Sequence, residues 1–135
     1  QPVPERLRAS RDTAPGGVVR VTRDELLDQV VVQLTRAVAI QREDADPAHE
    51  DFYAWGATLD EMTRRLAHLC RVLDGQIEHY GDNRILRDDA DADPADRIAS
   101  MRFRLRACAA DLDRANDAAR MYHSAASHLA VEVNP

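Results

Sequence analysis

From residue 98 to residue 129 the chain places an apolar side chain at every third or fourth position without a break. The positions are Ile98, Met101, Leu105, Cys108, Leu112, Ala115, Ala119, Tyr122, Ala126 and Leu129. This alternation of three and four is the heptad pattern of an α-helix that packs lengthwise against another helix. The pattern therefore predicts one long helix in this region and a partner helix of similar length.

A second apolar run supplies that partner. Its positions are Phe52, Trp55, Leu59, Met62, Leu66, Leu69, Leu73 and Ile77. The two runs fit together if the helices pack antiparallel with Phe52 opposite Tyr122. Trp55 then lies opposite Ala119, and a large side chain against a small one is what close packing requires. The sequence therefore predicts an all-α fold built on an antiparallel helical hairpin of two long helices.

Helix boundaries are marked by capping signals. Asp46 before Pro47 is a typical start, because the Asp side chain caps free amides and proline loses nothing at the first helical position. Asp93 before Pro94 repeats this signal for the last helix. Gly81 is a typical stop for the helix that begins at Pro47.

A shorter amphipathic segment precedes the hairpin. Thr22 and Glu25 form a capping-box pattern, and apolar positions then recur with helical spacing, which predicts a helix over 23–42. Residues 1–21 hold three of the six prolines and the only Gly-Gly pair, which predicts a flexible N-terminal arm. The expected architecture is thus a three-helix bundle in a single domain over 22–135.

The short helix leaves half of the hairpin uncovered, because it should lie level with residues 47–67 only. Two helices alone cannot shield a wide apolar surface from water. Homodimerisation is the expected solution, since symmetric dimers are the commonest soluble oligomers. The N-terminal arm, another protein, or a compact three-helix monomer are the alternatives. The residues expected at this interface are Leu69, Leu73, Ile77, Ile98, Met101 and Leu105.

An arginine belt offers a different function, the binding of nucleic acid or another polyanion. Its members are Arg64, Arg65, Arg71, Arg97, Arg102, Arg104 and Arg106. Against this stand 24 acidic residues and a net charge of −6. Nearby acids are expected to pair with the belt, within the chain or across a dimer; they are Asp60, Glu61, Asp74 and Glu78.

Catalytic and metal-binding patterns are weak. Residues 89–94 begin like a calcium loop, but Pro94 stands where that loop needs glycine and Ser100 where it needs a bidentate glutamate. No nucleophile with a base and no phosphate-binding glycine loop can be placed. Cys70 and Cys108 are expected to be reduced thiols, with Cys108 buried and inert. The sequence therefore predicts no enzyme, no metal and no cofactor.

No apolar run approaches the roughly 18 residues of a membrane span, and no secretory signal pattern is present. A cytoplasmic location without membrane contact is expected. The hypothesis with most support is a non-catalytic protein–protein interaction or scaffold module that acts as a helical homodimer.

Overall fold

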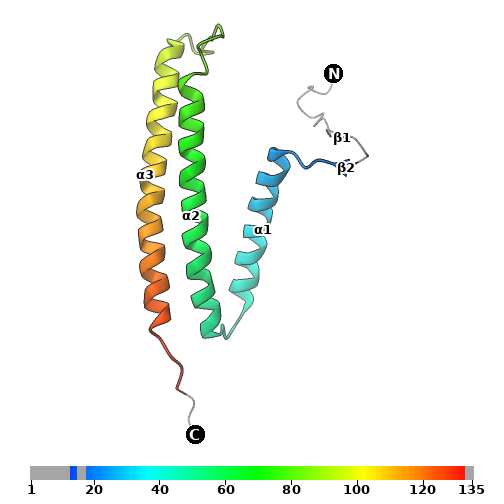
Figure 1. Ribbon diagram of the computed structural model, residues 1–135, viewed down its shortest axis with the longest axis vertical. Helices are drawn as coiled ribbons and strands as arrows, with labels where there is room; N and C mark the ends of the chain where they lie inside the picture. Colours follow the sequence, from blue (N-terminus) through cyan, green and yellow to red (C-terminus); the bar gives the residue numbers. More distant parts are fainter. Residues whose placement is uncertain (1–12, 15–17, 133–135) are drawn as a thin grey trace. The chain divides into compact units, whose positions relative to one another are not determined.

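The computed structural model describes residues 13–14 and 18–132, and its fold is all-helical apart from one minimal strand pair (Figure 1). The elements are β1 (Thr13–Ala14), β2 (Val18–Val19), α1 (Arg23–Glu43), α2 (His49–Glu78) and α3 (Pro94–Ser127). The chain divides into two compact units, with the boundary in the sequence between Pro47 and Ala48. None of the described helices is long and apolar enough to cross a membrane.

The first unit contains α1, whose bounds agree with the predicted helix to within one residue. The Thr22 hydroxyl accepts a hydrogen bond from the Glu25 amide at 3.2 Å, which is one half of the predicted capping box. Within the predicted arm, β1 pairs antiparallel with β2. The rest of that prediction falls on residues 1–12 and 15–17, which lie outside the described residues.

The second unit begins with α2, and here the predicted start is wrong. Asp46 does not cap the helix. It lies in the bend before the helix, where its own amide donates to the Asp44 carboxylate. The helix begins at His49 instead. Asp51 reaches back from the first turn and accepts a hydrogen bond from the Ala48 amide at 3.1 Å.

The predicted stop at Gly81 is also wrong, because α2 ends at Glu78 and consecutive turns follow. A polar centre then orders the connection to α3. Asp88 accepts hydrogen bonds from the Ala90 and Ala92 amides and binds the Arg97 guanidinium at 2.5 Å. The hydrogen bond from Arg97 is the main cause that lowers the pKa of the Asp88 carboxyl.

The start of α3 is as predicted. The Asp93 carboxylate accepts from the Ala95 amide at 2.9 Å, and Pro94 occupies the first helical position. The helix ends at Ser127, so Leu129 continues the apolar pattern beyond the helix itself.

The helices α2 and α3 lie side by side and run in opposite directions (Figure 1). Near one end of the pair, the Tyr122 hydroxyl donates to the Phe52 carbonyl oxygen at 2.8 Å. Near the other end, Arg102 at the start of α3 binds Asp74 late in α2. Early residues of α2 thus meet late residues of α3.

The residues between the two helices form what we call the seam, and all of them are buried or half-buried. On α2 the seam comprises Gly56, Asp60, Thr63, Ala67, Cys70, Asp74 and Ile77. On α3 it comprises Ile98, Arg102, Leu105, Ala109, Leu112, Asn116, Ala119, His123 and Ala126. Both sets keep the predicted alternation of three and four, but small and polar residues dominate them.

The prediction that the leucine run of α2 enters this seam is wrong. The seam positions lie one residue later along α2, which corresponds to a rotation of about 100° about the helix axis. Gly56, not Trp55, holds the seam position. A Cβ atom on Gly56 would lie 2.7 Å from the Cβ of His123, so the helices approach too closely there for an indole between them. The small seam residues permit this approach, and the large side chains are left on a flank of the pair.

Candidate interaction surface

One flank of the α2–α3 pair carries a continuous row of large apolar side chains from α2, which we call the apolar face. Its members are Phe52, Trp55, Leu59, Met62, Leu66, Leu69 and Leu73. From Trp55 onward each stands one residue before a seam position and therefore points sideways rather than toward α3. Leu59, Leu66 and Leu73 remain 41%, 45% and 37% exposed.

Side chains of α3 extend the apolar face. Because the helices are antiparallel, residues that precede seam positions on either helix lie on the same side of the pair. The hydrogen bond between Tyr122 and the Phe52 carbonyl demonstrates this proximity at one end. Met101 holds the equivalent position near the other end and is half exposed. The predicted burial of Cys108 is wrong, since its residue is exposed while Cys70 is buried.

The six residues predicted for a dimer interface divide between these two environments. Leu69, Leu73 and Met101 are exposed on the flank. Ile77, Ile98 and Leu105 are half-buried in the seam, where they hold α2 and α3 together. Only the first three are therefore available to a partner as the pair stands.

The arginine belt is largely neutralised within the chain. Six of its members bind carboxylates: Arg64, Arg65, Arg71, Arg97, Arg102 and Arg106. Arg104 instead lies over the Phe103 ring, at 5.4 Å from its centroid. The predicted pairing with Asp60, Glu61, Asp74 and Glu78 is confirmed.

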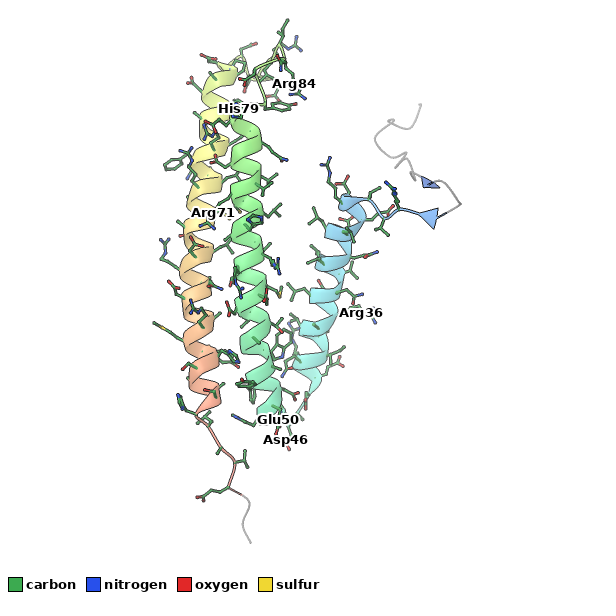
Figure 2. The ribbon with its side chains drawn as sticks, viewed as in Figure 1. Arg36, Asp46, Glu50, Arg71, His79 and Arg84 are labelled. Atoms are coloured by element: carbon green, nitrogen blue, oxygen red, sulfur yellow. The ribbon has the colours of Figure 1, made fainter. Side chains whose placement is uncertain are left out.

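Three of these arginines, Arg71, Arg102 and Arg106, bridge the helices. Arg71, labelled in Figure 2, binds Asp113 of α3. Asp74 binds the Nε atoms of Arg102 at 2.9 Å and Arg106 at 3.1 Å. The hydrogen bond from Arg102 is the main cause that lowers the pKa of the Asp74 carboxyl. These arginines thus position α3 on α2 rather than presenting free positive charge.

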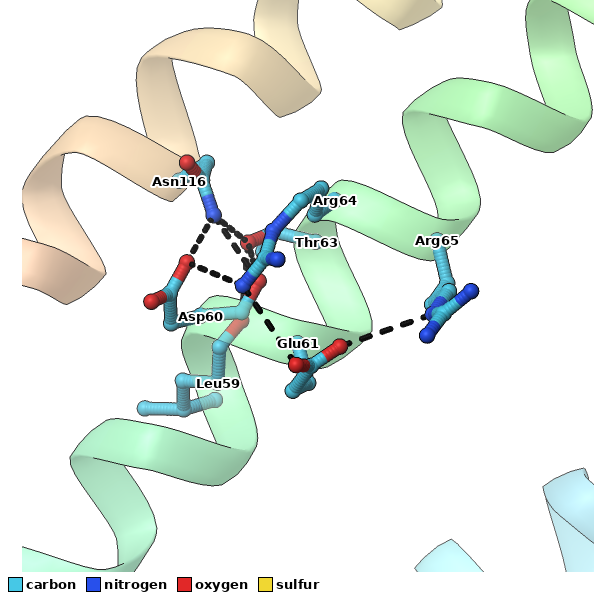
Figure 3. Close-up of polar contacts among 7 residues, drawn as sticks. All are labelled: Leu59, Asp60, Glu61, Thr63, Arg64, Arg65 and Asn116. Carbon is cyan, nitrogen blue, oxygen red and sulfur yellow. Dashed lines mark hydrogen bonds and ion pairs between the residues drawn. The ribbon is translucent and has the colours of Figure 1, made fainter.

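A polar cluster crosses the seam near its middle (Figure 3). The Asn116 amide of α3 donates to the Asp60 carboxylate at 2.6 Å, to the Asp60 carbonyl at 2.8 Å and to the Thr63 hydroxyl at 3.0 Å. The bond from Asn116 is the main cause that lowers the pKa of Asp60. A polar residue at one seam position fixes the register of paired helices, because any slip leaves it unsatisfied.

Sequence reasoning missed this cluster because it counted only apolar residues as seam positions. The available signal was that Asp60, Asp74, Arg102 and Asn116 recur at the same heptad spacing as the leucines. Acidic positions on one helix face Arg and Asn positions on the other, which is the pattern of a polar seam.

Other chemical sites are sparse in the described part of the chain. No group of three or more His, Cys, Asp or Glu side chains there is arranged to hold a metal ion. An open apolar hollow of about 280 Å³ lies where α2 begins and α3 ends, between His49, Phe52, Tyr122 and Leu129. It continues the apolar face through Phe52 and Tyr122.

No protein-family model, curated protein or solved structure matches this chain. Its function is therefore inferred from its own residues.

Proposed function

We propose that this chain is a non-catalytic protein–protein interaction module that acts as a helical homodimer through the apolar face. One observation carries the proposal: the leucines of α2 lie outside the seam, where α3 leaves them more than one third exposed. Monomeric proteins rarely expose continuous apolar surfaces of this kind, and such surfaces mark interaction sites.

The energetic argument follows from what the seam lacks. Complete burial of a leucine contributes about 1.5–3 kcal/mol, whereas glycine, alanine and ion-paired aspartate contribute little. The seam of α2 consists mainly of the latter kinds. Most of the hydrophobic stabilisation available to this chain therefore lies in the apolar face and is gained only when that face is covered.

Helix α1 supports the same proposal because it carries a matching stripe. Leu27, Val30 and Leu34 recur at helical spacing, and no residue of α1 is buried. This stripe is therefore a second apolar surface that the chain offers to a partner. In the proposed dimer a second copy covers the apolar face around Leu69 and Leu73, which are both 37% exposed.

The test is the solution mass, measured by sedimentation equilibrium at several concentrations. The parent chain should have the mass of a dimer, and the double variant Leu69→Glu, Leu73→Glu should have the mass of a monomer. Val72→Glu is the matched control, because Val72 is 41% exposed on the same helix but on a side away from the apolar face. It should remain a dimer.

Circular dichroism of each variant verifies that the helices persist. A parent chain that stays monomeric at every concentration would refute the proposal, as would a double variant that dimerises like the control. Polyanion binding, the alternative function, has less support because carboxylates of the chain already bind six of the seven arginines.

A further inference from the structure

The two cysteines of the chain meet across the seam. Cys70 is a seam residue of α2, while Cys108 directly precedes the seam residue Ala109 of α3. Both are free thiols, and the cross-seam bonds of Asp60 with Asn116 and of Asp74 with Arg102 place them at nearly the same level of the antiparallel pair. Cys70 is buried and Cys108 is exposed.

The backbones also approach closely at this level. Ala67 is 1% exposed and Ala109 is 4% exposed, which makes them the two most buried apolar residues of the described chain. They flank the cysteine pair in the seam. A disulfide needs Cα atoms roughly 5.5 Å apart, and alanines on facing helices permit the close backbone contact from which that separation is reached.

We propose that Cys70 and Cys108 form an oxidative modification site, at which a hydroperoxide converts the two thiols into a disulfide that links α2 to α3. The exposed Cys108 sulfur attacks the peroxide oxygen, which gives a sulfenic acid and releases water or an alcohol. The Cys70 sulfur then attacks the Cys108 sulfur, the S–S bond forms and water leaves. The two thiols lose two hydrogen atoms, and the peroxide is reduced.

The order of these steps follows from the two environments. Burial raises the pKa of the Cys70 thiol, so Cys70 is a poor first target for peroxide. It is well placed as the second thiol, because it faces α3 in the seam at nearly the level of Cys108. A reducing thiol such as glutathione reverses the bond by exchange.

The experiment treats the full chain with hydrogen peroxide at low protein concentration, alkylates the remaining thiols and measures the intact mass. We expect a loss of two hydrogen atoms, no alkylation, and a Cys70–Cys108 peptide that reductant releases. The melting temperature should rise by roughly 10 °C on oxidation, because the bond closes a long loop of the unfolded chain. Cys70→Ala and Cys108→Ala should each abolish both effects.

The proposal is overturned if Cys108 proceeds to sulfinic acid, links two chains together or does not react, while Cys70 keeps a free thiol. It does not depend on dimerisation. The Leu69→Glu, Leu73→Glu variant should form the same disulfide, so failure of one proposal leaves the other intact.

Discussion

The close contact at Gly56 makes an unusual prediction, that adding one methyl group to a helix destabilises it. Alanine is favoured over glycine inside a helix by about 1 kcal/mol. In α2, however, a Cβ at position 56 would lie 2.7 Å from the Cβ and 2.9 Å from the Cα of His123. The Cα belongs to the backbone, so α3 itself must move to relieve the clash. Overpacking of this kind costs about 1–3 kcal/mol.

Gly75 is the matched control, because it lies in the same helix and a Cβ there would meet nothing within 4 Å. We expect Gly75→Ala to stabilise the fold by about 0.5–1 kcal/mol and Gly56→Ala to destabilise it by about 1 kcal/mol. For a chain of this size each kcal/mol shifts the melting temperature by about 3–6 °C, so the variants should differ by roughly 5–10 °C. The assay is thermal unfolding by far-UV circular dichroism at one fixed protein concentration. Equal stabilisation by both substitutions would show that α2 and α3 are not in close contact at this level.

Two further predictions concern the polar seam. Asn116→Ala removes the donor shared by the Asp60 carboxylate and the Thr63 hydroxyl. In a urea titration it should lower the free energy of unfolding by about 1–2 kcal/mol. The control Arg114→Ala, at an exposed ion pair, should change the free energy of unfolding little. Unchanged stability of the Asn116 variant would contradict the role of the cluster. Arg102 lowers the pKa of Asp74 in the folded chain, so this carboxylate stabilises the fold at pH values above its ordinary pKa near 4, and the contribution disappears as the pH falls through the lower folded value. Acid titration followed by circular dichroism should therefore show that Asp74→Asn is less stable than the parent chain at neutral pH, and that its stability changes less than that of the parent between pH 4 and pH 2. A parallel shift of the whole stability-against-pH curve would exclude this linkage.

Helix positions were predictable from the sequence because capping and periodicity are local. Thr22 at the start of α1 and Asp93 with Pro94 at the start of α3 act as expected. The error at the start of α2 has a local physical origin. Asp44 and Asp51 compete for the amides that Asp46 was expected to organise, and a side chain that can serve several nearby amides does not mark a single residue as the cap.

The orientation of the apolar run was not predictable from periodicity alone. A heptad stripe shows that a helix has an apolar side, but it does not say which neighbour covers that side. Where two helices approach closely, small residues occupy the contact between them. Ala67 and Ala109 hold these positions here. The two helices do meet at the predicted level of Phe52 and Tyr122, because the Tyr122 hydroxyl donates to the Phe52 carbonyl oxygen.

A seam of small and polar residues specifies an arrangement more than it stabilises one. The bonds of Asn116 to Asp60 and of Asp74 to Arg102 fix the register and the direction of α3 against α2, because both are satisfied in only one alignment. Exposed leucines on the apolar face supply the larger hydrophobic term, but only once another surface covers them. Specificity and driving force are thus assigned to different sides of the same helix. Under the proposed dimerisation, formation of the α2–α3 pair and covering of its apolar face are coupled, so that each partner surface stabilises the fold that presents it.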